Sequence, residues 1–388
     1  MKKTTPYACV KAVCCDTMKL QIHTERVRVM AMKVGVVGCG SISDIYLQNM
    51  IREFDNLEVV ACCAAHLENA QKKAEQYGIR GCTYEQILED PAIEMVVILT
   101  PAPTHYDLIR RGLEAGKHVY TEKTITIDLA QAKELEALAA EKGLYLGSAP
   151  DTFLGAALQK ARRVIDSGEL GDITGFHICA NRCLDWLTTY FKFLRLPGGG
   201  ICFDYGVYYL TALVSLLGPV AEVCATVENR KPTRIDCNPE SEDFGKEFRY
   251  ENEGQVNALI WTEGGVTGTF TLNGESLIAD MAVFTIYGTK GVLKLTDPNG
   301  FGGDIKLVTV ENWQFAERVV ENELPYSGNS RGLGPAEMAA AISEGRPNRA
   351  NARMAVHVLD IICAMMESGE KKCFVPVAST CDRPEPLL

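Results

Sequence analysis

The sequence lacks the features by which several classes of protein are identified. No apolar run approaches the ~18 residues of a membrane-spanning helix, so we predict no membrane span. Basic side chains are outnumbered by acidic ones, 39 to 50, and the net charge is −11. This charge argues against a protein that binds the phosphate backbone of nucleic acids or an anionic membrane surface.

Patterns of metal-binding cysteines are missing as well. The chain has 15 cysteines, but no two are spaced C-x2-C, and no cluster of His and Cys completes four ligands. We therefore predict no metal site. Cys62, Cys63 and Cys363 lie in apolar runs, which is typical of buried reduced thiols. So many cysteines expected to be reduced thiols indicate a reducing, cytoplasmic compartment.

The length and the residue pattern predict two domains. A chain of 388 residues exceeds what one core usually holds. Residues 1–31 form an extension to which we assign no function. Over residues 32–149, apolar β-branched strands alternate with helices, which predicts an α/β domain with a doubly wound parallel sheet of the Rossmann type. The pattern over residues 150–388 predicts an α+β domain with a large, mostly antiparallel, open-faced sheet. The two helices that close the chain could pack back on the first domain.

A glycine-rich loop follows the first predicted strand and opens a helix. Gly38 would allow the tight turn, and Gly40 would let the backbone approach a pyrophosphate. Ser41 and Ile42 lead into the helix, whose free N–H groups would face the phosphates. Ser43 replaces the usual third glycine and is small enough for close packing of helix and strand. Strand, loop and helix together predict a dinucleotide site.

The second strand ends without the acid that usually binds the adenosine ribose. Ala64 occupies that position, and neither residue 65 nor His66 is an Arg or Lys that would attract a 2′-phosphate. His66 could instead contact the adenosine or lie in solvent. We predict NAD as the cofactor, and the sequence does not exclude NADP.

Three further segments carry a family resemblance. Thr100-Pro101 with His105, the stretch Ala115–Lys123, and Gly198–Tyr208 stand in the same order as motifs of the glucose–fructose oxidoreductase/inositol dehydrogenase/MocA family. The chain resembles this family over about residues 33–377. The resemblance implies a Rossmann domain followed by an open-faced sheet domain, hydride transfer between NAD(P) and a sugar or polyol, and frequent assembly through the sheet faces.

The resemblance places Lys123 beside the nicotinamide. Independently of it, Lys123 follows the carboxyl end of a parallel strand, where open α/β sheets bind ligands. Asp204 and Tyr208 are four residues apart and would share a face of a helix. A nearby lysine would lower the tyrosine pKa, so Lys123 and Tyr208 form a plausible acid–base pair that Asp204 could orient. Glu122 could pair with Lys123 or contact the cofactor. Thr124 stands where the family has a proline, and Tyr208 where it often has a histidine.

Other candidates rest on weaker patterns. By the resemblance, Thr100, Pro101 and His105 lie near the nicotinamide, although a histidine at a helix start could also be exposed to solvent. Weak candidates for binding the substrate are charged or aromatic residues in two loops, namely Arg182, Asp185, Trp186 and Arg331.

Two functions stay open at this point. The first is a dehydrogenase that acts on a sugar, glycoside or polyol, for instance at C3 of a glucose-like ring. The second is a non-catalytic regulator or scaffold of the same fold that binds nucleotide. Apolar residues lie on both faces of the strand at 254–262, with Val256, Ala258 and Ile260 on one and Leu259 and Trp261 on the other. This pattern predicts a homo-oligomer assembled sheet to sheet.

Overall fold

A computed structural model describes residues 31–279 and 282–387. The N-terminal extension, to which we assign no function, lies outside the described residues apart from Ala31. Among the residues described, no helix combines the length and the apolar character that crossing a membrane requires.

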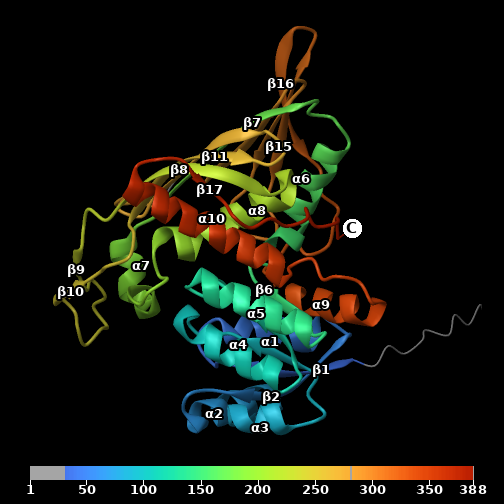
Figure 1. The fold of residues 1–388 in the computed structure, drawn as a ribbon, viewed down its shortest axis with the longest axis vertical. Helices are drawn as coiled ribbons and strands as arrows, with labels where there is room; N and C mark the ends of the chain where they lie inside the picture. Colours follow the sequence, from blue (N-terminus) through green and yellow to red (C-terminus); the bar gives the residue numbers. More distant parts are fainter. Residues whose placement is uncertain (1–30, 280–281, 388) are drawn as a thin grey trace, which may run out of the picture. The chain divides into compact units, whose positions relative to one another are not determined.

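The first half forms a parallel sheet of six strands in the order β3-β2-β1-β4-β5-β6 (Figure 1). The strands are β1 Met32–Val37, β2 Leu57–Cys63, β3 Arg80–Cys82, β4 Met95–Ile98, β5 His118–Thr121 and β6 Leu146–Ser148. The helices between them are α1 Ser43–Arg52, α2 Leu67–Tyr77, α3 Tyr84–Glu89, α4 His105–Glu114 after the turn η1 Ala102–Thr104, and α5 Leu129–Glu141. This order confirms the predicted doubly wound α/β fold.

Both faces of the first sheet are buried, which explains why its strands are uninterrupted apolar runs. Val34 and Val36 of β1 pack in a core with α1, whereas Val37 packs in a second core with α4 and α5. Residues at odd and at even positions of these strands both point into a core, so both have to be apolar. The parallel arrangement directs the carboxyl ends of β1, β4 and β5 to one edge of the sheet.

The second half is built on a nine-stranded sheet in the order β16-β15-β14-β13-β7-β12-β11-β8-β17. Its strands are β7 Ile173–Asn181, β8 Val220–Glu228, β11 Gln255–Thr262, β12 Thr267–Asn273, β13 Val283–Gly288, β14 Val292–Leu295, β15 Ile305–Glu311, β16 Gln314–Val320 and β17 Val375–Pro376. A separate hairpin joins β9 Thr233–Ile235 and β10 Glu247–Arg249. Only the β12–β7 pair is parallel among the described strands of the large sheet, as the prediction of a mostly antiparallel sheet requires.

Helices cover one face of the large sheet. They are α6 Ala156–Asp166 after η2 Thr152–Leu154, α8 Val207–Leu217 after the π-helix η4 Cys202–Gly206, and α10 Ala352–Lys371. Of the remaining helices, α7 Leu184–Tyr190, followed by the 3-10 helix η3 Lys192–Arg195, contacts β9, and α9 Leu333–Glu344 contacts β6 of the first sheet. Along β11, Val256 and Ile260 are fully buried, whereas Leu259, on the opposite face, is 45% exposed. The outer face of this sheet is thus uncovered in the single chain.

Helix α10 packs against both sheets (Figure 1). Ala352 and Val356 join the core of the first sheet beside α5, and Ile361 and Met365 join the core of the second. A helix that is apolar on two sides is expected where it lies between two layers. The last helix therefore fixes the first sheet against the second.

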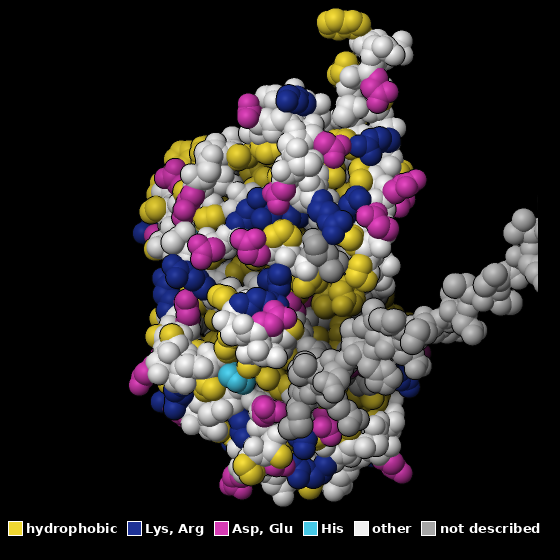
Figure 2. Space-filling view, turned by 90° about the vertical axis from the view of Figure 1, so that its right-hand side faces the viewer, with side chains coloured by type: hydrophobic (Ala, Val, Ile, Leu, Met, Phe, Trp, Pro, Cys, Tyr) yellow, Lys and Arg dark blue, Asp and Glu magenta, His cyan; other side chains and the backbone are white. Residues whose placement is uncertain are grey.

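The β15–β16 hairpin projects from the rest of the chain. Trp313 and Phe315 at its turn are 98% and 86% exposed. Figure 2 shows apolar side chains at the end of this projection, and elsewhere on the same face it shows charged side chains of both signs interspersed with apolar ones.

A buried carboxylate ties α9 to the segment that leads into α10. Glu337 is 4% exposed and accepts hydrogen bonds from Arg346 Nη1 at 2.5 Å and Arg349 Nη1 at 2.6 Å, and from the Arg349 backbone N–H at 2.9 Å. Glu344 also contacts Arg346, from an exposed position. The two glutamates thus share a partner and differ in burial.

We expect Glu337→Ala to lower the free energy of unfolding by about 3 kcal/mol, because it leaves two arginines without their buried partner. The matched variant Glu344→Ala removes an exposed ion pair and should cost less than about 1 kcal/mol. Urea denaturation followed by circular dichroism measures both. Equal losses for the two variants would show that burial of Glu337 does not matter.

Candidate active site

A cavity of about 290 Å3 opens at the carboxyl edge of the first sheet, between this edge and the η4–α8 segment. Its lining combines the glycine loop, the ends of β4 and β5, and residues of the second half. The lining residues are Gly40, Ser41, Ile42, Leu99, Thr100, Pro101, Ala102, Pro103, Glu122, Lys123, Thr124, Phe191, Phe193, Leu194, Pro197, Gly198, Gly199, Phe203, Asp204 and Tyr208. Most of the predicted cofactor and catalytic residues therefore face one space.

The geometry of the glycine loop suits a dinucleotide. Gly38 has φ +106°, and a Cβ there would lie 2.9 Å from the backbone carbon of Leu99, so only glycine fits. A Cβ on Gly40 would meet nothing within 4 Å, so the glycine leaves open space in front of the loop. Ser43 is fully buried, and its hydroxyl donates to the Gly40 carbonyl oxygen at 2.6 Å. The N-terminus of α1 thus faces a space into which a pyrophosphate fits.

The end of β2 offers no ribose acceptor at the expected position. The strand stops at Cys63, and Ala64 follows it. His66 is an exposed residue at the N-cap of α2, and its side chain makes no capping hydrogen bond. Neither a carboxylate nor an Arg or Lys occupies residues 64–66, so these positions do not select NAD over NADP.

Lys123 meets Asp204 across the cavity. Lys123 Nζ forms an ion pair with the Asp204 carboxylate and donates to the Asp204 backbone carbonyl at 2.8 Å. It also lies 5.3 Å from the centre of the Tyr208 ring. Lys123 follows β5, whereas Asp204 and Tyr208 belong to η4 and α8. The two halves of the chain therefore supply one group of three polar side chains.

Charges and burial act in opposite directions on these groups. Burial, the largest single influence, lowers the pKa of Lys123, but the negative charges of Asp204, Tyr208 and Glu122 together outweigh it. The pKa is therefore raised and the lysine stays protonated. Burial raises the pKa of Tyr208, and the Lys123 charge offsets only part of that rise. The Lys123 charge therefore lowers the pKa of Tyr208 as expected, but the net pKa still lies above its ordinary value. Desolvation outweighs the nearby cation there.

Glu122 is oriented by the first half of the chain. Its carboxylate accepts a hydrogen bond from the Tyr46 hydroxyl at 2.7 Å and one from the Lys123 backbone N–H at 3.0 Å. Of the two roles considered for it, the ion pair with Lys123 Nζ is not formed. Glu122 lines the cavity instead.

The three glycines at 198–200 are explained by close neighbours. A Cβ on Gly199 would lie 2.2 Å from the Leu194 carbonyl oxygen, and one on Gly200 would lie 1.9 Å from the Glu253 carboxylate. Glu253 Oε1 accepts from the backbone N–H of Cys202 at 2.9 Å, at the start of η4. This carboxylate caps the turn that carries Asp204, and burial raises its pKa to about 7. Sequence reasoning missed Glu253, because it comes from a loop 49 positions after Asp204 and belongs to no motif.

His105 is neither exposed nor part of the cavity lining. It is fully buried, with Nδ1 2.7 Å from the Thr124 carbonyl oxygen and Nε2 2.7 Å from the Thr100 carbonyl oxygen. The interpretation as a solvent-exposed residue is wrong. His105 holds together the two loops, after β4 and β5, that line the cavity.

The four weak substrate candidates do not line the cavity. The Arg182 guanidinium lies 4.2 Å from the centre of the Tyr205 ring. Arg331 donates to Asn299 Oδ1 at 2.9 Å, and its pKa is lowered by burial but raised further by the charges of Tyr208 and Glu122. Arg331 therefore acts on Tyr208 through its charge and a side-chain hydrogen bond, although it does not line the cavity.

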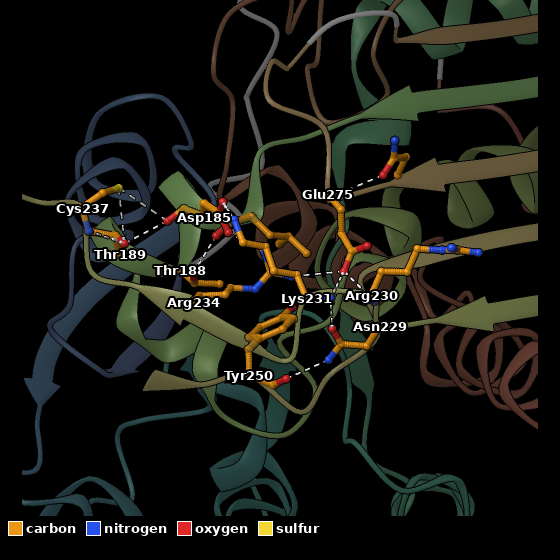
Figure 3. Close-up of polar contacts among 12 residues, drawn as sticks. Asp185, Thr188, Thr189, Asn229, Arg230, Lys231, Arg234, Cys237, Tyr250 and Glu275 are labelled. Carbon is orange, nitrogen blue, oxygen red and sulfur yellow. Dashed lines mark hydrogen bonds and ion pairs between the residues drawn. The ribbon is translucent and has the colours of Figure 1, made fainter. Parts of the chain in front are cut away.

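The other two weak candidates lie on α7. The carboxylate of Asp185 is engaged by Arg234 at 2.7 Å and by Lys231 (Figure 3). The Asp185 carboxylate predicted to meet a substrate is thus engaged in two ion pairs and lies outside the cavity lining. Trp186 is an exposed neighbour of the cavity-lining Phe191, with ring centres 6.3 Å apart. Within residues 31–279 and 282–387, no group of three or more His, Cys, Asp or Glu side chains is arranged to hold a metal ion.

A Rossmann sheet with an open glycine loop, facing a lysine that is held by the second half of the chain, defines a nucleotide-dependent oxidoreductase. Two family models match the chain: the oxidoreductase family with the NAD-binding Rossmann fold over residues 32–149, and the GFO/IDH/MocA C-terminal domain over residues 158–294. The chain belongs to the GFO/IDH/MocA family of NAD-binding oxidoreductases, which confirms the resemblance.

Known relatives agree in fold and class. The chain is 28% identical over 280 residues to trans-1,2-dihydrobenzene-1,2-diol dehydrogenase of Bos taurus, covering 69% of this chain and 75% of that one. It is 29% identical over 215 residues to the uncharacterized oxidoreductase YhhX of Escherichia coli K12, covering 53% of this chain and 54% of that one. Levoglucosan dehydrogenase in complex with NADH has a similar fold, with a TM-score of 0.79 and 19% identity over 90% of this chain and 100% of that one.

Glu253 leads to a prediction about pH. Its pKa in the folded chain lies above its ordinary value, so the stability it contributes is present at low pH and is lost as the pH rises through about 7. Glu253→Gln keeps an acceptor without the charge. The parent chain loses stability over this range and the variant does not. We therefore expect the free energy of unfolding of the variant, minus that of the parent, to rise by about 2 kcal/mol between pH 5 and pH 8.

Urea titrations at several pH values measure this difference, with Glu251→Gln as the control, because Glu251 is exposed nearby. A difference that stays constant with pH would show that Glu253 is not the titrating group.

Proposed function

We propose that the protein is an NAD(P)-dependent dehydrogenase that oxidises a secondary alcohol of a sugar, glycoside or polyol, for instance at C3 of a glucose-like ring. The observation that carries this proposal is the position of the Lys123 ammonium group. It is fixed by Asp204 beside Tyr208 in a cavity whose other wall is the glycine loop. Alcohol oxidation needs a cation, a group that exchanges a proton and a dinucleotide-binding loop in one place.

The roles of the residues follow from their charges. The nicotinamide, when bound, supplies the hydride acceptor. Lys123, which stays protonated, donates a hydrogen bond to the reacting oxygen and stabilises negative charge that develops there. Tyr208 exchanges the proton of that oxygen, and Asp204 holds the lysine in place. Because burial keeps the pKa of Tyr208 high, oxidation becomes faster as the pH rises, and reduction is favoured near neutral pH.

The names of the relatives support this substrate class. Trans-1,2-dihydrobenzene-1,2-diol dehydrogenase and levoglucosan dehydrogenase are named for compounds that carry ring hydroxyl groups. We propose a ring polyol for this chain on the same basis.

We expect Lys123→Met and Tyr208→Phe each to lower kcat for polyol oxidation by 10²–10⁴-fold, because each removes a group that acts on the reacting oxygen. Tyr208→Phe should also abolish the rise of kcat/KM between pH 7 and pH 10. The rate of NADH formation across a panel of sugars and glycosides measures both effects.

Lys192→Met is the control, because Lys192 is an exposed lysine paired with Asp243. Binding of NADH, followed by fluorescence, should be nearly equal in all variants. Unchanged turnover in both active-site variants would refute the assignment of roles. Tight cofactor binding with no reduction by any polyol would instead support the nucleotide-binding regulator.

We also propose a homo-oligomer in a reducing, cytoplasmic compartment. The uncovered face of the large sheet presents Leu259, Tyr287 and the paired rings of Trp261 and Phe374, which lie 5.2 Å apart. Such a face is stabilised when a second copy covers it. The fully buried free thiol of Cys202 supports the reducing compartment.

We expect Leu259→Asp to shift the oligomer towards the mass of a single chain, because the charge would be buried in the interface between sheets. Phe244→Asp, at an exposed loop position, is the control and should keep the parent mass. Light scattering at micromolar concentration distinguishes the two. A parent protein that already has the mass of one chain would contradict the proposal.

A further inference from the structure

Four aromatic side chains form a continuous apolar shelf on α7 and η3. Trp186, Tyr190, Phe191 and Phe193 are 48%, 44%, 38% and 46% exposed. Ring centres lie 4.5 Å apart for Trp186 and Tyr190, 6.3 Å for Trp186 and Phe191, and 6.2 Å for Phe191 and Phe193. We call these four residues the aromatic shelf. Exposed apolar groups gathered in this way mark a site of binding.

The shelf is continuous with the cavity described above. Phe191 and Phe193 line the same space as Lys123 and Tyr208. Tyr190 and Trp186 extend the apolar surface outward from this lining. When the reacting hydroxyl of a ligand lies at Lys123, a group attached to the ligand's ring can therefore contact the aromatic shelf.

Contacts between α7 and the segment 229–252 hold the aromatic shelf in position. Asp185, at the start of α7, is gripped by Lys231 and by Arg234, and Arg234 is 1% exposed (Figure 3). Cys237 donates its backbone N–H to the Thr189 hydroxyl at 3.3 Å. The carboxylate predicted to meet a substrate thus positions the helix that carries Trp186 and Tyr190.

The η3 part of the shelf is fixed in the same way. Arg195 donates to the Thr188 carbonyl oxygen at 2.8 Å and to Asp236 Oδ2 at 2.8 Å. Asn252 donates to the carbonyl oxygens of Leu194 and Leu196 at 3.1 and 2.8 Å. Because these contacts are already made without a ligand, little conformational entropy is lost when the shelf binds one.

We propose that the aromatic shelf binds a planar apolar aglycone, so that the preferred substrate is an aryl glycoside rather than a free sugar. This inference rests on the proposed function. One aromatic side chain is enough to stack on one sugar ring. The four aromatic side chains of the shelf extend beyond the sugar and can contact a group attached to it. A second sugar ring would need several hydrogen-bonding partners. The charged residues on α7 and η3, namely Asp185, Lys192 and Arg195, are already engaged in ion pairs.

The test compares matched pairs of ligands that differ only in the aglycone. These are the methyl and phenyl β-D-glucopyranosides, galactopyranosides and xylopyranosides, with cellobiose as the ligand that offers a second sugar. Binding in the presence of NAD is measured by calorimetry, and kcat/KM by NADH formation. We expect the phenyl compound of at least one pair to bind about tenfold more tightly than its methyl partner. The preference should fall to threefold or less in Trp186→Ala and Phe193→Ala. It should be unchanged in Trp313→Ala, a control on the distant β15–β16 hairpin.

Several results would overturn the proposal. They are the absence of a phenyl preference in every pair, a preference that survives both variants, and cellobiose binding as tightly as the phenyl compounds. A loss of NADH affinity in Phe193→Ala as large as the loss of phenyl affinity would assign the shelf to the cofactor. A lower mass of Trp186→Ala in light scattering would assign it to a subunit interface. Oxidation of sugars without a phenyl preference refutes the shelf alone, whereas phenyl-dependent binding without any oxidation refutes the proposed function alone.

Discussion

The ion pair between Lys123 and Asp204 is the interaction on which the site depends. It joins a residue just after β5 to one in η4, and so links the two halves of the chain within the cavity. A buried ammonium group needs a partner, and Asp204 supplies both its carboxylate and its backbone carbonyl. The charge is thereby held at the mouth of the nucleotide loop, where it can act on a reacting oxygen.

The surroundings of this pair serve to keep it in place. Glu253 caps the turn that carries Asp204, and Gly200 is a glycine because that carboxylate occupies the space of a side chain. On the other side, the buried His105 ring lies between the loops after β4 and β5, with each ring nitrogen 2.7 Å from a backbone carbonyl oxygen. Helix α10 packs against both sheets and so fixes one against the other.

Burial decides the acid–base behaviour of the site as much as charge does. Lys123 keeps its proton because the negative charges of Asp204, Tyr208 and Glu122 together compensate for lost hydration. Tyr208 has a cation nearby and yet a raised pKa, because loss of solvent outweighs that cation. The same balance makes Glu253 titrate near neutrality. A lysine placed near a tyrosine is therefore not sufficient to make the tyrosine a strong base.

The sequence by itself determined the two sheets and the glycine loop, and its resemblance to a family pointed to Lys123, Asp204 and Tyr208. Strand periodicity, glycine spacing and short motifs are local signals, and they act through residues close together in the chain. Only the tertiary structure decided that Asp185 is engaged by Lys231 and Arg234, that His105 is buried, and that Glu253 caps η4. These outcomes depend on contacts between segments tens of residues apart, and on burial. Neither leaves a pattern in the sequence.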